Sequence, residues 1–170
     1  HINTVTIEIT QTGKYFVVLN VDFEPERRTN EGCAIGIDVG IKEFYSDSNG
    51  RVVDNPKYLE KSERKLIRAQ RKLSRKKKGS NNYNKQRIRL AKVHEKIANQ
   101  CNDFLQKQST MLISENQTIC IEDLDIKGMV RNHKFAKSIS SASWGKFFTM
   151  LRYKAAWYGN DVIEVPTMYP

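Results

Sequence analysis

Residues 33–39 read C-A-I-G-I-D-V, a nearly continuous apolar run that one aspartate, Asp38, interrupts. Such a run is typical of a strand that is buried on both faces and lies in the middle of a sheet. A carboxylate in this position is costly unless it is paired, hydrogen-bonded or bound to a metal ion. Gly36 and Gly40, on either side of it, would let another backbone or a ligand approach closely. Asp38 is therefore a candidate functional residue, with a loop-capping role as the alternative.

Short strands are expected on both sides of this run. Before it, residues 4–10 alternate as T-V-T-I-E-I-T, which predicts a strand with one face in solvent, and residues 15–23 form a second β-rich run. After it, residues 44–47 and 51–53 flank Asn49-Gly50, a dipeptide favoured in type I′ hairpin turns. The sequence thus predicts an N-terminal hairpin and then three antiparallel strands.

An amphipathic helical hairpin is expected over residues 57–116. Leucines repeat every seven residues from Leu59 to Leu73, and apolar residues recur in steps of three and four from Leu90 to Met111. The polar stretch G-S-N-N at residues 79–82 breaks the pattern between them. Two helices that fold back on one another explain both the periods and the break.

The C-terminal part predicts two more strands and a helix. Residues 118–121 read T-I-C-I, a short buried strand that leads directly into Glu122. Residues 126–140 show no sustained period and predict a loop or a short irregular helix. Ser143 is placed to cap a further amphipathic helix, and residues 161–165 predict a last short strand. This order of elements predicts an α/β fold with a mixed sheet.

Glu122 supplies a second carboxylate at the end of a buried strand. A strand that follows a long helical crossover tends to lie parallel to the first strand and near it, and the carboxyl ends of such neighbours form a ligand crevice. Asp38 and Glu122 would then face one another and repel unless a divalent cation neutralises them. Oxygen ligands select Mg²⁺ or Mn²⁺ rather than zinc, and two such ions about 3.5–4 Å apart can support in-line attack on a phosphodiester.

The positive charge of the chain is concentrated in one segment. The net charge is +10, but residues 61–96 contain fifteen Lys and Arg against two acids, so the rest of the chain is slightly acidic. This distribution indicates a polyanionic partner, and nucleic acid is favoured over a membrane because no apolar face accompanies the cluster. A solvated surface helix is the alternative. By charge density, the candidate nucleic-acid-binding residues are Arg64, Arg68, Arg71, Lys72, Arg75, Lys76, Lys77 and Lys78.

The three cysteines give no sign of a metal site. Cys33, Cys101 and Cys120 lie far apart, form no paired ligand spacing, and are expected to be small core residues. Their odd number and the lack of a signal-peptide pattern predict a reducing, cytoplasmic location. The chain opens at His1 rather than Met, so we expect it to be an excerpt of a longer protein.

Several short motifs occur in a fixed order along the chain. They are G-I-D-V-G-I-K (36–42), L-S-R-K-K-K-G-S (73–80), K-V-H-E-K-I-A-N (92–99), I-E-D-L (121–124), S-I-S (138–140) and S-W (143–144). Together they resemble the TnpB (OrfB) transposon-associated proteins, relatives of the type V CRISPR effectors. The resemblance runs over residues 32–170 and implies an RNase H-like (RuvC-like) nuclease domain, incomplete here, with the helical hairpin 57–116 inserted in it. Residues 1–31 resemble the last strands of that family's wedge-like β-barrel domain, followed by a linker.

The resemblance implies an RNA-guided DNA endonuclease encoded by bacterial or archaeal insertion sequences, which uses Mg²⁺ or Mn²⁺ and has DNA and a guide RNA as partners. Asp38 and Glu122 match the first two of the family's three catalytic carboxylates, whereas Asp123 and Asp125 would stabilise the following loop. The third carboxylate and a zinc-binding ribbon lie beyond the present sequence, so zinc would belong only to that ribbon. The basic hairpin would contact phosphates of the nucleic acid without reading its sequence. The 170 residues alone are expected to bind nucleic acid with little or no cutting.

Three alternatives remain at this point. Sugar kinases and actin-like ATPases also begin with an Asp-x-Gly strand, but they favour a small hydroxyl or glycine-rich phosphate loop where this chain has Ile41-Lys42. The second alternative is a nucleic-acid-binding scaffold in which the catalytic fold is incomplete or has lost activity. A DNA-strand-transfer transposase could use the same two-metal chemistry as the nuclease.

Overall fold

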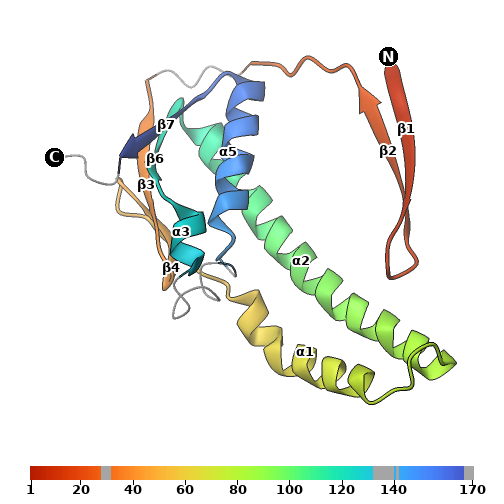
Figure 1. Cartoon of the computed structure of the whole chain (residues 1–170). Coiled ribbons are helices and arrows are strands. Elements are labelled where there is room, and N and C mark those ends of the chain that lie inside the picture. Colours follow the sequence, from red (N-terminus) through yellow and green to blue (C-terminus); the bar gives the residue numbers. More distant parts are fainter. Residues whose placement is uncertain (28–31, 132–139, 141, 167–170) are drawn as a thin grey trace. The chain divides into compact units, whose positions relative to one another are not determined.

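The computed structural model describes residues 1–27, 32–131, 140 and 142–166, and Figure 1 labels most of their helices and strands. The chain divides into two compact units, and each is described by itself. The first comprises His1–Glu24 and Tyr58–Cys101, and the second comprises Pro25–Lys57 and Asn102–Pro170. The mixed α/β composition predicted from the sequence is confirmed. No helix in the described ranges is long and apolar enough to cross a membrane.

A β-hairpin opens the first unit. Strands β1 (Ile2–Ile9) and β2 (Tyr15–Val21) pair antiparallel, and Gly13 occupies the turn between them with a φ of 83°. The prediction of one buried face is wrong, because every residue of both strands is exposed. The alternating pattern gives the strand its period, but burial also requires a layer against the apolar side, and the described residues provide none.

Two helices complete the first unit, as the sequence predicts. They are α1 (Tyr58–Ser74) and α2 (Asn81–Glu115), and α2 continues into the second unit. Gly79 adopts a φ of 83° between them, and the Ser80 hydroxyl accepts a hydrogen bond from the backbone N–H of Tyr83 (3.1 Å), which caps α2. The buried Gln86 side chain donates to the Ala69 carbonyl (3.2 Å), so a hydrogen bond joins the two helices directly.

A five-stranded mixed sheet forms the second unit, in the order β5-β4-β3-β6-β7. The central strand β3 pairs antiparallel with β4 and parallel with β6, while β4 pairs antiparallel with β5 and β6 parallel with β7. The predicted three antiparallel strands and the parallel neighbour are thus confirmed. The strand bounds are β3 (Ala34–Val39), β4 (Glu43–Asp47), β5 (Val52–Asp54), β6 (Thr118–Asp123) and β7 (Asp161–Pro166).

The turn between β4 and β5 differs from the predicted type I′ turn. That turn type requires a positive φ at both central residues, but Gly50 has one (82°) and Asn49 does not. The Asp47 carboxylate accepts hydrogen bonds from the N–H groups of Asn49 (3.0 Å) and Arg51 (2.9 Å), and the Asp47 carbonyl accepts one from Gly50 (3.0 Å). These bonds favour a longer loop with glycine in the left-handed position.

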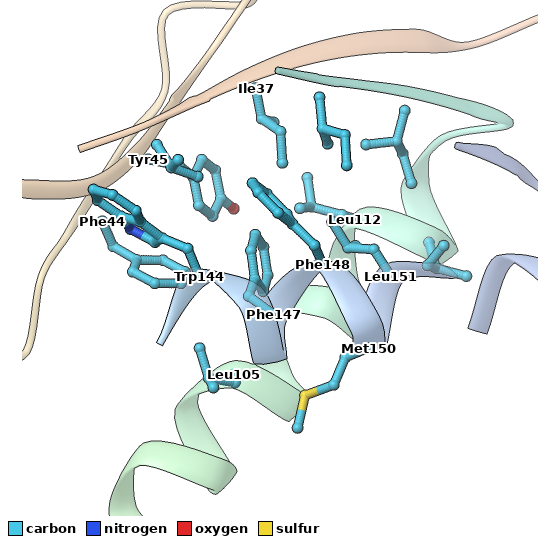
Figure 2. Close-up of a cluster of buried hydrophobic side chains, with 14 of the residues drawn as sticks. Ile37, Phe44, Tyr45, Leu105, Leu112, Trp144, Phe147, Phe148, Met150 and Leu151 are labelled. Atoms are coloured by element: carbon cyan, nitrogen blue, oxygen red, sulfur yellow. The ribbon is translucent and has the colours of Figure 1, made fainter. Parts of the chain in front are cut away.

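Among the described residues, the core lies against one face of the sheet. Figure 2 shows aromatic and aliphatic side chains of β3, β4, the second half of α2 and α5 (Trp144–Tyr158) packed together. Ile35, Ile37 and Val39 of β3 are buried, whereas Ala34 and Asp38 are exposed. The prediction of a strand buried on both faces is therefore wrong. Gly36 and Asp38 interrupt the run on the second face, where small and polar residues need no apolar cover.

The elements around α5 follow the sequence in part. Ser143 precedes the helix as predicted, but its hydroxyl makes no capping bond and donates instead to the Ser140 carbonyl (3.3 Å). The predicted loop or irregular helix at 126–140 contains α3 (Ile126–Arg131), and residues 132–139 lie outside the described ranges. Cys33 is exposed, so the prediction of a core residue is wrong for that position.

Lys154 is a buried cation that joins α5 to α2. It is 6% exposed, and its ammonium group donates to the Ser109 hydroxyl (2.8 Å), the Thr110 hydroxyl (2.7 Å) and the Gln106 carbonyl (3.0 Å). Burial lowers the pKa of Lys154 from its usual value of 10.5. The three neutral acceptors satisfy its hydrogen bonds but provide no opposite charge.

We expect the pH dependence of stability to report this burial. Between the lowered pKa of folded Lys154 and the usual 10.5 of the unfolded chain, the unfolded state binds more protons, so stability rises with pH. Denaturant unfolding at several pH values below 10 should therefore show a wild-type gain with pH that Lys154→Met lacks. Above pH 10 the opposite effect begins, because burial raises the pKa of Tyr45 to about 12. Identical pH profiles of the two proteins would contradict the assignment.

Candidate functional site

Asp38 and Glu122 lie side by side on the face of the sheet opposite the core. The parallel register of β3 and β6 pairs Ile37 with Ile121, and each carboxylate follows immediately after one of these buried isoleucines. Because side chains alternate along a strand, both carboxylates point away from the core. Neighbouring strands are about 4.8 Å apart, so two side chains in register on one face are close neighbours. The predicted juxtaposition of the two strand ends is present.

The two carboxylates line a common open hollow of about 610 Å³. Asp38 is exposed and Glu122 is half-buried, so both reach solvent from the rim of the sheet. The hollow is formed by residues of four strands and of the turn after β4. Its other lining residues are Gly36, Ile37, Ser46, Asp47, Ser48, Cys120, Ile121, Val165 and Pro166.

Two hydrogen bonds between Gly36 and Ser48 fix the backbone that lines this hollow. Gly36 donates its N–H to the Ser48 hydroxyl (3.2 Å), and the Ser48 N–H donates to the Gly36 carbonyl (2.9 Å), which anchors the β4–β5 turn on β3. A side chain at Gly40 would contact the Glu43 carbonyl at 3.0 Å, so the predicted close backbone approach occurs there. At Gly36 the nearest atom would be 3.9 Å away, which leaves room for a Cβ.

The acidic residues near the hollow have different roles. Asp47 is engaged in the turn through the N–H groups of Asn49 and Arg51. Asp125 directly precedes α3 and accepts a hydrogen bond from the Gly128 N–H (2.9 Å), as predicted for a residue that stabilises the following segment. Asp38 and Glu122 are the acidic pair that shares one face of adjacent strands.

This pair fits a hard divalent cation, although it does not enclose one. No group of three or more His, Cys, Asp or Glu side chains that could hold a metal ion occurs in the described ranges. Mg²⁺ usually takes only one or two protein carboxylates and completes its coordination with water and substrate phosphates. Two carboxylates on an open sheet face match that requirement, and the Ser46 hydroxyl, paired with Asp38 across β3 and β4, adds a third oxygen nearby.

All eight of the predicted basic residues lie in the first unit. Arg64, Arg68, Arg71, Lys72 and Arg75 line a shared hollow of about 510 Å³ along α1, and Ile67 is its apolar member. Spacings of three and four residues place these cations on one side of the helix. The other three, Lys76, Lys77 and Lys78, are exposed in the turn that follows α1.

A second basic groove was missed from the sequence. It has a volume of about 460 Å³ and lies between α1 and α2, with cations on both walls. The sequence pattern that indicates this groove is a spacing of cations at i, i+3 and i+7, which occurs once in each helix. This spacing places three cations on one face of each helix. The cations are Lys65, Arg68 and Lys72 on α1 and Arg89, Lys92 and Lys96 on α2.

These features define an α/β protein with a paired-carboxylate hollow and a strongly basic helical hairpin. A family model described as OrfB_IS605, "Probable transposase", matches residues 14–133, which include both carboxylates and the whole of the basic segment. The chain belongs to this family. The resemblance to the OrfB proteins predicted from the sequence motifs is thereby confirmed.

Similar proteins carry related names. The chain is 40% identical over 167 residues to a "Putative RNA-guided DNA endonuclease" of Streptomyces pristinaespiralis, covering 98% of this chain and 42% of that protein. It is 30% identical to the "Putative RNA-guided DNA endonuclease InsQ" of Escherichia coli K12, covering 92% and 43% respectively. A Mycobacterium tuberculosis protein of the same description is 28% identical, covering 80% and 32%. The chain spans less than half the length of these relatives.

Proposed function

We propose that this protein is an RNA-guided DNA endonuclease of an insertion sequence, with an RNase H-like (RuvC-like) nuclease domain that contains Asp38 and Glu122. The observation that carries the proposal is the position of these two carboxylates: each follows directly after the paired Ile37 or Ile121 on adjacent parallel strands, and both line one open hollow. The names of the relatives support the same activity.

In this proposal Asp38 and Glu122 would hold Mg²⁺ or Mn²⁺. When bound, such an ion stabilises negative charge on the phosphodiester and activates water for in-line attack. The carboxylates orient the ion, and the exposed face of β3 and β6 leaves the access that a DNA strand needs. The cations along α1 would hold the guide RNA and DNA through their phosphates, independently of sequence.

The number of ligands sets the activity expected of the 170 residues. Two carboxylates bind a divalent ion weakly, and the described residues add no third acidic ligand to the pair. We expect cleavage from a protein as long as the relatives and mainly nucleic-acid binding from this chain alone.

Metal removal tests the nuclease activity. The chain extended to the length of its relatives is incubated with its guide RNA and an end-labelled DNA target, with Mg²⁺ or with EDTA. We expect cleavage in Mg²⁺ or Mn²⁺, its loss in EDTA, and nucleic-acid binding under both conditions, because the basic hairpin acts without the metal. Cleavage that persists in EDTA would overturn the proposed metal site.

A scaffold without catalytic activity is the second candidate, favoured by the incomplete set of acidic ligands. It predicts the same binding but no cutting by the extended protein in Mg²⁺. Strand transfer, which the family description suggests, would instead yield joined DNA products on the same gel.

A further inference from the structure

The groove between α1 and α2 carries six cations and no acid. Lys65, Arg68 and Lys72 line one wall, and Arg89, Lys92 and Lys96 line the other; no carboxylate occurs among the described residues that line it. Cations that line the same groove repel one another and attract a polyanion strongly. This concentration of charge on facing walls goes beyond what solubility of a surface helix requires.

The groove is held in shape by the chain itself. Gln86 and Ala69 both line it, and the hydrogen bond from the Gln86 side chain to the Ala69 carbonyl (3.2 Å) joins the two helices there. Val93 adds an apolar contribution from α2. Because this contact lies within the groove lining, we expect the walls to be positioned before any ligand arrives.

The size of the groove and the residues that line it indicate which kind of polyanion it can bind. The groove has a volume of about 460 Å³, which is the size of a small-ligand pocket, so it admits the backbone of one phosphodiester strand more readily than a duplex. No aromatic residue lines the groove in the described part of the chain, which leaves base stacking without a platform. Contacts with phosphates therefore dominate, and they do not depend on base sequence.

We propose that this groove binds the phosphodiester backbone of a single nucleic-acid strand, through Lys65, Arg68 and Lys72 on one side and Arg89, Lys92 and Lys96 on the other. The inference deepens the proposed nucleic-acid function and rests on it. Arg68 and Lys72 also line the separate hollow along α1. The hairpin thus presents two adjoining phosphate-binding surfaces, with these two residues on the ridge between them.

The test neutralises the α2 wall and measures the salt dependence of binding. Arg89→Gln, Lys92→Gln and Lys96→Gln are combined, and fluorescence anisotropy follows labelled single-stranded RNA and single-stranded DNA of one mixed sequence. Each phosphate contact with a single strand contributes about 0.7 to the slope of log K against log salt, so the slope should fall by about 2. From 50 to 200 mM salt, the wild-type protein should lose roughly 15-fold more affinity than the variant.

A matched control removes the same charge elsewhere on the same hairpin. Lys61→Gln, Lys85→Gln and Arg87→Gln replace exposed cations of α1 and α2 that line neither hollow. We expect this triple variant to retain most of the wild-type slope. An equal decrease of the salt slope in the two triple variants would overturn the proposed groove site, because binding would then follow the overall charge of the hairpin.

Four further measurements complete the test. Circular dichroism should show the same helicity for all variants, and a charge-conserving Lys92→Arg, Lys96→Arg variant should bind like wild type, which excludes misfolding as the cause of the loss. The same slope change with a DNA duplex would overturn the preference for one strand. Asp38→Asn should leave the salt slope unchanged. If the extended wild-type protein fails to cut in Mg²⁺ but still shows the groove effect, the nuclease proposal alone is contradicted.

Discussion

Replacing Asp38 by Asn is expected to abolish DNA cleavage by the full-length protein while leaving its fold and nucleic-acid binding intact. The side chain is exposed on the open face of β3, so the substitution removes the proposed metal ligand without leaving a buried group unpaired. Metal stabilisation of the reacting phosphate supplies several kcal/mol, so the expected loss is on the order of 1,000-fold. Cleavage of end-labelled DNA with guide RNA and Mg²⁺ measures it, and Glu122→Gln should give a loss of the same order.

Asp123→Asn provides the control on the same strand. Asp123 follows Glu122 directly but does not line the hollow, so we expect nearly wild-type cleavage. Thermal unfolding provides a readout besides activity. Without divalent ions Asp38→Asn should unfold at or slightly above the wild-type temperature, because the substitution relieves repulsion from Glu122. Added Mg²⁺ should raise the wild-type Tm and not that of the variant. Cleavage by Asp38→Asn at the wild-type rate would remove this carboxylate from the mechanism.

Hydrophobic period predicted the elements of the second unit well, because these strands and helices are all positioned by one shared core. The apolar run at 33–39 identified β3 as central, and T-I-C-I identified its parallel neighbour β6. The same logic failed for burial. Period alone does not say whether a second layer covers a face, so β3 was predicted to be covered on both sides and β1 on one.

Side-chain hydrogen bonds account for the local errors. The Asn49-Gly50 dipeptide suggested a two-residue turn, but the Asp47 carboxylate bonds the backbone of the following residues and favours a longer loop. Ser143 was placed correctly, yet its hydroxyl bonds the chain before it rather than the helix. Which backbone group a polar side chain bonds depends on the groups that compete for it locally, and the residue type alone does not determine that partner.

The two parts of the candidate site differ in how far the sequence could predict them. Asp38 and Glu122 stand out as carboxylates at strand ends, and strand adjacency follows from the crossover rule. Charge density along one segment identified the cations of α1. It missed the opposite wall, because Arg89, Lys92 and Lys96 are spaced along α2 and do not form a dense run of cations. The repeated i, i+3, i+7 spacing would have indicated it.

Phe147→Ala is expected to destabilise the second unit by about 3–5 kcal/mol, the usual cost of removing a buried ring. Phe147 is fully buried, and its ring centroid lies 5.0 Å from that of Phe44 and 6.1 Å from that of Tyr45 (Figure 2). These partners belong to β4, and Tyr45 pairs with Val39 next to Asp38. The cavity would therefore also loosen the strand pair that positions the candidate site. Urea unfolding at neutral pH measures the change.

Trp157→Ala tests whether burial, rather than the loss of any aromatic ring from α5, is the cause. Trp157 is on the same helix but is 50% exposed, and its ring contacts that of Tyr153 at 4.8 Å. Its removal should lower stability by about 1 kcal/mol, since one exposed aromatic pair contributes about that much. With a free energy of unfolding of roughly 5–15 kcal/mol, the Trp157 variant should stay folded. The Phe147 variant should lose a large share of its free energy of unfolding. Similar midpoints for the two variants at unchanged m-values would mean that Phe147 does not occupy the core described here.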